Sequence, residues 1–141
     1  MPAADQIQLI SEKSKSFWMD RIIVESPAKI NLGLNVVGKM NDGYHNIETV
    51  FYPIMLSDKI IIEKSKQILF DSDSEYLNNL KDNLILRAIQ LMEEKSGQKI
   101  SVRIFVEKKI PIGGGLGGGS SNAASTLKSI NRLYKIGRAH V

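Results

Sequence analysis

The sequence has no cysteine and only one tryptophan in its 141 residues. The missing thiols exclude disulfide bonds, thiolate metal sites and a cysteine nucleophile. No apolar stretch approaches the roughly twenty residues of a membrane span, and no segment has the form of a signal peptide. The formal net charge is only +4 and the isoelectric point is near 9.3. Because the lysines and arginines are scattered, we predict an anionic small-molecule ligand and neither a nucleic-acid nor a membrane partner.

Glycine, by contrast, is concentrated in one place. Six of the eleven glycines lie within Gly113–Gly119, in the stretch Pro-Ile-Gly-Gly-Gly-Leu-Gly-Gly-Gly-Ser-Ser-Asn that runs from Pro111 to Asn122. A backbone that brings several N–H groups to one anion has no room for Cβ atoms and needs φ angles open to glycine. A helix that follows directly points its free N–H groups at the same anion. The stretch therefore predicts a phosphate cradle.

A flexible glycine-serine linker is the alternative, and the flanking sequences argue against it. Upstream, every second residue is apolar, as in a half-buried strand: Ile100, Val102, Ile104 and Val106. Downstream, apolar residues recur on one helical face: Ala123, Leu127, Ile130 and Tyr134. We expect Ser120 or Ser121 to cap that helix. In a Walker A alignment Ser120 would replace the obligatory lysine, and a Gly-x-Gly-x-x-Gly match inside six glycines carries little information.

The rest of the sequence predicts an α+β domain. Strands are expected at 21–25, 30–37, 46–55, 58–63 and 67–70. Pro27 is expected to separate the first two, because proline cannot sit in a central ladder. The stretch Asn41-Asp42-Gly43 predicts a turn. A helix is expected to begin at Asp82 and to end at Gly97. We expect the domain to cover 19–135, after a disordered or non-native extension at 1–18 and before residues 136–141, which match one reading frame of a sequencing adapter.

Two short stretches carry further groups of chemical interest. Lys29 and Asn31 are two positions apart, so along a strand both side chains point to the same face. A single surface lysine is usually only solvated. Tyr44 and His45 follow the predicted turn, where an aromatic ring beside an imidazole can stack on and hydrogen-bond a base. A surface tyrosine with a surface histidine is the commoner outcome.

Together, the stretches 26–32, 42–45, 82–85 and 111–124 resemble the 4-diphosphocytidyl-2-C-methyl-D-erythritol kinases, a family of the GHMP kinase superfamily. The resemblance implies an α+β fold like domain 2 of ribosomal protein S5, incomplete at its C-terminus. It also implies a cytoplasmic enzyme of non-mevalonate isoprenoid biosynthesis. With ATP and Mg2+, such an enzyme phosphorylates the 2-hydroxyl of 4-diphosphocytidyl-2-C-methyl-D-erythritol.

The resemblance further implies roles for particular residues. Lys29 would be the catalytic residue beside the reacting hydroxyl, and it would offset charge that develops there. Asn31 would contact the same substrate, and Tyr44 and His45 would hold its cytosine. No residue is assigned as a metal ligand. The ATP phosphates would be wrapped by the glycine loop, with its serines near phosphate and magnesium: Pro111, Ile112, Gly113, Gly114, Gly115, Leu116, Gly117, Gly118, Gly119, Ser120 and Ser121.

The family also uses an aspartate that follows the helix beginning near Ser120, and the sequence stops within that helix. We therefore expect this polypeptide to lack kinase activity and the intact gene to encode an active enzyme. Another GHMP kinase, acting on a sugar, mevalonate or homoserine, stays open as an alternative, as does an RNA-binding module of S5-like fold. The stretch Asp42–His45 argues against the first, and the lack of lysine or arginine in 111–124 argues against the second. The oligomeric state stays open.

Overall fold

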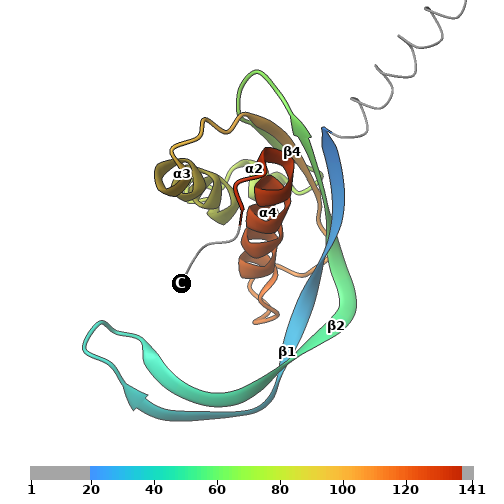
Figure 1. The fold of residues 1–141 in the computed structure, drawn as a ribbon. Helices are drawn as coiled ribbons and strands as arrows, with labels where there is room; N and C mark the ends of the chain where they lie inside the picture. Colours follow the sequence, from blue (N-terminus) through green and yellow to red (C-terminus); the bar gives the residue numbers. More distant parts are fainter. Residues whose placement is uncertain (1–19, 138–141) are drawn as a thin grey trace, which may run out of the picture.

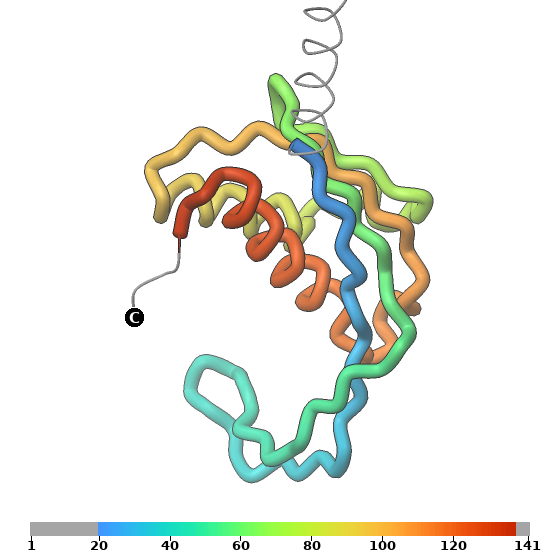
Figure 2. The backbone as a smooth tube through the Cα atoms, turned by 45° about the vertical axis from the view of Figure 1, so that its right-hand side comes forward, coloured from blue at the N-terminus to red at the C-terminus, as the bar shows by residue number. Residues whose placement is uncertain are grey.

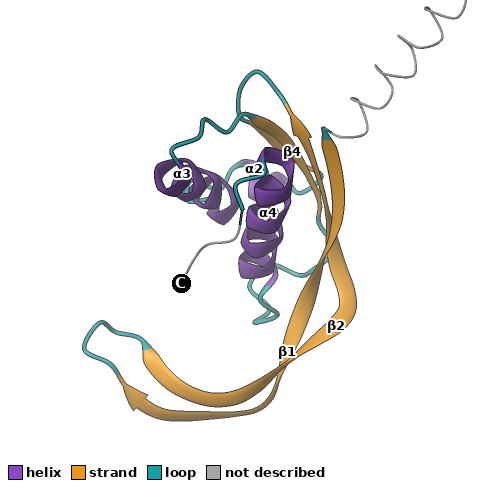
Figure 3. Cartoon of the chain, viewed as in Figure 1, coloured by secondary structure: helices purple, strands orange, loops and turns teal. Residues whose placement is uncertain are grey.

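The computed structural model describes residues 20–137, so the predicted extension at 1–18 and all but the first two residues of the predicted adapter segment 136–141 lie outside the described part of the chain. The sheet has the strand order β1-β2-β4-β3, in which only the β3–β4 pair is parallel. Helices α3 and α4 lie on one face of the sheet (Figures 1 and 3). This arrangement confirms the predicted α+β class. The elements are β1 (Arg21–Lys39), β2 (His45–Lys64), β3 (Leu69–Ser72), α2 (Glu75–Asn78), α3 (Leu84–Ser96), β4 (Val102–Glu107) and α4 (Gly118–Tyr134).

Strands β1 and β2 form one long hairpin, where four shorter strands were predicted. The predicted break at Pro27 is wrong because β1 is an edge strand and its register shifts between Pro27 and Lys29. An edge position with a bulge tolerates a residue that has no N–H to donate. The predicted turn is confirmed: Gly43 has a φ of +89°, and the Tyr44 N–H donates to Asp42 Oδ1 at 3.0 Å. The far half of the hairpin curves beyond the helices (Figure 2).

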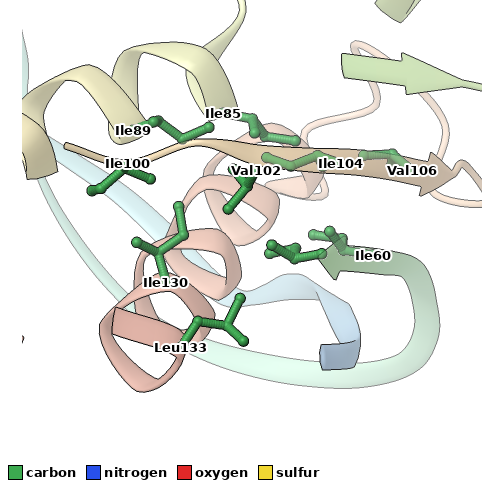
Figure 4. Packing of buried hydrophobic residues seen from close by; sticks show 10 residues of the cluster. Ile60, Ile85, Ile89, Ile100, Val102, Ile104, Val106, Ile130 and Leu133 are labelled. Atoms are coloured by element: carbon green, nitrogen blue, oxygen red, sulfur yellow. The ribbon is translucent and has the colours of Figure 1, made fainter. Parts of the chain in front are cut away.

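The core lies between the helices and the half of the sheet that they cover. The alternation predicted for β4 is confirmed, since Val102, Ile104 and Val106 are fully buried. They meet apolar side chains from β2, α3 and α4 (Figure 4). The complete cluster consists of Ile60, Ile62, Ile85, Ile89, Ile100, Val102, Ile104, Val106, Ile130 and Leu133. A packed core at this end of the sheet fixes the positions of the β4 and α4 ends between which the glycine loop runs.

The predicted N-cap residues of α3 and α4 are both wrong by a few positions. Asn83, not Asp82, caps α3, because its Oδ1 accepts the Ile85 N–H at 2.9 Å. Asp82 instead forms an exposed ion pair with Arg87. The prediction that Gly97 ends this helix is confirmed by its left-handed C-cap conformation, with a φ of +68°.

None of the helices within residues 20–137 is long and apolar enough to cross a membrane.

Helix α4 begins at Gly118 with Gly117 as its N-cap residue, so Ser120 and Ser121 lie in the first turn and do not cap it. The buried face of α4 also differs from the predicted one. Ala123, Leu127 and Tyr134 are only half-buried, and small polar residues are buried in their place. The buried residues of α4 are Asn122, Thr126, Ser129, Ile130 and Leu133.

Candidate active site

The glycine loop has the backbone geometry of an anion site. Gly113, Gly115 and Gly117 have φ angles of +74°, +70° and +71°, so left-handed residues alternate with their neighbours. Such alternation turns successive N–H groups toward one side of the chain, as in anion-binding nests. The loop leads directly into α4, whose first N–H groups have no helical carbonyl to bind. Because the first turn of α4 carries no acidic residue, its positive dipole end is available to an anion.

At two positions of the loop, an added side chain would crowd its neighbours. A Cβ added at Gly117 would lie 3.1 Å from Lys29 Cε and 3.2 Å from Lys29 Cγ. A Cβ added at Gly118 would lie 3.0 Å from Ile110 Cγ2 and 3.1 Å from Lys108 Nζ. Glycine is therefore favoured for two reasons: the positive φ at Gly117, and the close approach of Lys29 to Gly117 and of Ile110 and Lys108 to Gly118.

Lys29 is bound to the glycine loop through both its backbone and its side chain. Its N–H donates to the Leu116 carbonyl at 2.9 Å, and its Nζ donates to the Gly115 carbonyl at 2.7 Å. Nζ also donates to Asn31 Oδ1 at 2.6 Å, which confirms that the two side chains share a face. The ammonium lies 5.4 Å from the ring centroid of Phe51 on β2. These four contacts hold one cation at the edge of the loop.

The end of the loop separates two hollows. One, of about 340 Å³, has an apolar wall that includes Tyr76, Leu77 and Leu84 opposite the loop backbone. The other, of about 510 Å³, lies on the β1 side and is lined by Lys29 and Phe51 among others. Gly117 and Ser120 line both hollows. Two ligands bound in these hollows would therefore approach each other at the start of α4.

Ser26 and Asp58 were missed by the sequence analysis. Ser26 is fully buried, and its Oγ donates to Ser121 Oγ at 2.9 Å. Asp58 is also fully buried. Burial opposes its ionisation, but hydrogen bonds from the Ile110 N–H, the Lys108 ammonium and the Lys109 N–H outweigh that effect and lower the pKa of the Asp58 carboxyl below its ordinary value. A signal was present, because Asp58 occupies the inward register of Ile60 and Ile62.

Tyr44 and His45 lie where the chain turns from β1 into β2, and this end of the hairpin stands apart from the start of α4 in Figures 1 and 2. Tyr44 is 73% exposed. Within residues 20–137, no hydrogen bond joins either residue to Lys29, Asn31 or the glycine loop. The structure thus unites Lys29, Asn31 and the loop, while the proposed base-binding pair stands apart. The same residues contain no cluster of three or more acidic, histidine or cysteine side chains suited to a metal ion.

Comparisons with known proteins agree with this geometry. The sequence profile of the GHMP kinases N terminal domain matches residues 83–140. The chain is 45% identical over 112 residues to the 4-diphosphocytidyl-2-C-methyl-D-erythritol kinase of Persephonella marina, covering 79% of this chain and 41% of that protein. The kinase of the same name from Prosthecochloris aestuarii is 44% identical over 118 residues, with 84% and 41% coverage.

Solved structures show the same relationship in three dimensions. A crystal structure of 4-(cytidine 5'-diphospho)-2C-methyl-D-erythritol kinase superposes with a TM-score of 0.65 at 36% identity, covering 83% of this chain and 46% of that one. The Methanococcus jannaschii mevalonate kinase superposes with a TM-score of 0.62 at 23% identity over 84% of this chain and 42% of that one, which shows a shared fold alone. The chain spans about 41% of the length of the first curated relatives. It belongs to the GHMP kinase family, as an N-terminal domain of the 4-diphosphocytidyl-2-C-methyl-D-erythritol kinase type.

Proposed function

We propose that this chain carries the ATP-binding part of a kinase that phosphorylates the 2-hydroxyl of 4-diphosphocytidyl-2-C-methyl-D-erythritol. The observation that carries the proposal is the attachment of the Lys29 ammonium to the Gly115 carbonyl at 2.7 Å, beside the N-terminus of α4. One cation therefore lies between a backbone anion cradle and a second hollow. The relatives named as this kinase support the choice of substrate. A cytoplasmic location stays a prediction.

The residues present fit a nucleotide triphosphate. The loop offers N–H groups and a closely packed glycine surface that a Cβ at Gly117 or Gly118 would disturb. The adjoining apolar wall of Tyr76, Leu77 and Leu84 suits a purine base. We place the phosphates over Gly113–Ser121 and the base against that wall. Magnesium binds through phosphate oxygens with few protein ligands, and the Ser120 and Ser121 hydroxyls are the nearest candidates to complete its shell.

The chemistry assigned to Lys29 is electrostatic. Phosphoryl transfer asks the protein mainly to position groups and to stabilise developing charge. Asn31 and the Gly115 carbonyl fix the direction of the Lys29 ammonium. In the hollow beside Phe51, that ammonium would lower the pKa of the acceptor hydroxyl and attract the transferring group. Tyr44 and His45 are proposed to hold the cytosine from the end of the hairpin.

The test is transfer of labelled γ-phosphoryl from ATP with Mg2+, using the protein expressed from its intact gene. We expect transfer to the cytidylyl substrate and none to galactose, mevalonate or homoserine. Lys29→Met should reduce turnover about a hundredfold or more, the usual effect of losing one transition-state donor. A preferred acceptor other than the cytidylyl compound would reject the proposed substrate. Unchanged turnover in Lys29→Met would remove Lys29 from the mechanism.

A further inference from the structure

The fully buried carboxylate of Asp58 joins β2 to the segment that enters the glycine loop. Its Oδ1 accepts two backbone hydrogen bonds, from the Lys109 N–H at 2.7 Å and from the Ile110 N–H at 2.8 Å. Its Oδ2 accepts from Lys108 Nζ at 2.5 Å. One oxygen thus fixes the backbone just before Pro111, and the other fixes an ammonium. The two functions can be separated by substitution.

The Lys108 ammonium faces the same hollow as the loop. Its side chain is only 9% exposed, yet Lys108 lines the hollow together with Gly118 and Asn122. Nζ would lie 3.1 Å from a Cβ at Gly118, the first residue of α4. Asn122 is 2% exposed, and its Oδ1 has no hydrogen-bond partner within residues 20–137. A buried acceptor without a partner is rare and points to a water or to a donor group of a ligand, not to a phosphate oxygen.

The charge of Lys108 is only partly used by its protein contacts. An ammonium has three N–H donors, and in the described part of the chain one hydrogen bond from Lys108 Nζ is found, to Asp58. Lys108 lines a hollow that is also lined by the first residues of α4. A phosphate group in that hollow would meet both the helix N–H groups and this ammonium.

We propose that Asp58 is a positioning residue of the nucleotide site, and that the Lys108 ammonium it holds binds a phosphate of the nucleotide. This inference rests on the proposed function, because it requires a nucleotide at the glycine loop. Lys108 then supplies the cation that the loop itself lacks, from beneath the start of α4. Lys29 remains on the opposite side, in the hollow of the acceptor.

A purely structural ion pair is the competing explanation, since breaking a buried pair destabilises a protein whatever it binds. The two explanations differ in how the loss depends on phosphate. A phosphate-binding ammonium contributes to the affinity for ADP and ATP and contributes little to the affinity for adenosine. A structural pair affects the three ligands alike, or changes only the thermal stability.

The experiment measures binding of adenosine, ADP and ATP by calorimetry, well below each melting temperature. Lys108→Met should lower the ADP and ATP affinities about tenfold to hundredfold, the usual effect of one charge-assisted hydrogen bond, and change the adenosine affinity less than about twofold. Asp58→Asn keeps an oxygen for the two backbone amides but presents N–H groups to the Lys108 ammonium. It should therefore lower the ADP and ATP affinities by a similar factor. The double variant should be no worse than either single variant.

Lys59→Met is the matched control. Lys59 is next to Asp58 on β2 and pairs with Glu107 of β4 at 3.1 Å, but it lines neither hollow. The ADP affinity of the Lys59→Met variant should equal that of the wild-type protein. Should Lys108→Met fail to fold, Lys108→Gln retains a donor for Asp58 without the charge and should show the same phosphate-dependent loss. Unchanged ADP affinity in a folded Lys108 variant, or an equal loss for adenosine, would overturn the inference alone. Absence of ADP binding by the wild-type chain would overturn the proposed function and this inference with it.

Discussion

Replacing Gly117 by alanine tests whether the glycine loop and Lys29 work as one unit. Gly117 has a φ of +71°, and its added Cβ would lie 3.1 Å and 3.2 Å from two methylene carbons of Lys29. Ordinary contacts between carbons are about 3.5–4.0 Å, so the lysine side chain must move by several tenths of an ångström. This movement should displace its ammonium from the short hydrogen bonds to Gly115 and Asn31.

Two effects of different size should follow. The left-handed conformation costs an L-residue about 1–2 kcal/mol, which lowers the free energy of unfolding. The displaced ammonium should reduce kcat more strongly. A misplacement of about 1 Å can cost a hundredfold, so a displacement of several tenths of an ångström should reduce kcat about tenfold.

Gly97→Ala is the control for conformational strain. Gly97 also has a positive φ, +68°, but it ends α3 and has open space where the Cβ would lie. We expect both variants to lose similar stability in urea titrations, and only Gly117→Ala to lose kcat in the phosphoryl-transfer assay. Equal kcat values in the two variants would refute the claim that Gly117 is needed to place Lys29.

Three further predictions concern stability, and each is measured by urea or thermal unfolding. Asn83→Ala should lose about 1 kcal/mol because it removes the cap of α3, whereas Asp82→Ala should lose little; the opposite order would restore Asp82 as the cap. Tyr134→Phe should cost about 1–3 kcal/mol, since the Tyr134 hydroxyl donates to the Ser101 carbonyl and accepts its N–H, both at 2.9 Å; no change would mean that water replaces both bonds. The lowered pKa of Asp58 gives stability that is present above its ordinary pKa of about 3.9 and is lost as the pH falls through the lowered value. The wild-type advantage over Asp58→Asn should therefore shrink on acidification, and a constant difference would contradict the shift.

Local chemistry allowed much of the site to be predicted. The spacing of Lys29 and Asn31 placed both on one strand face, and the structure joins them by a hydrogen bond. The alternation before the glycine loop and the helical spacing after it predicted a loop between a strand and a helix, which is where the structure has it. Such features depend on the period of a strand or helix and on glycine conformations, which neighbouring residues determine.

Contacts between distant residues could not be predicted in the same way. Ser26 meets Ser121, and Asp58 meets Lys108, only because the sheet and α4 pack together. The break expected at Pro27 was wrong for a related reason, since the rule against proline in a strand does not apply at a sheet edge with a bulge. The order of strands in the whole sheet decides which strand lies at the edge, so an edge position cannot be recognised from the short sequence around Pro27.

The central claim is that the glycine loop at the start of α4 binds the phosphates of ATP. The most direct measurement is a nuclear magnetic resonance titration of the 15N-labelled chain with Mg2+ and a non-hydrolysable ATP analogue, compared with adenosine. We predict saturable shifts of the backbone amides of Gly117, Gly118, Gly119 and Ser120 that the analogue produces and adenosine does not. Saturable binding that leaves these four amides unmoved would contradict the account.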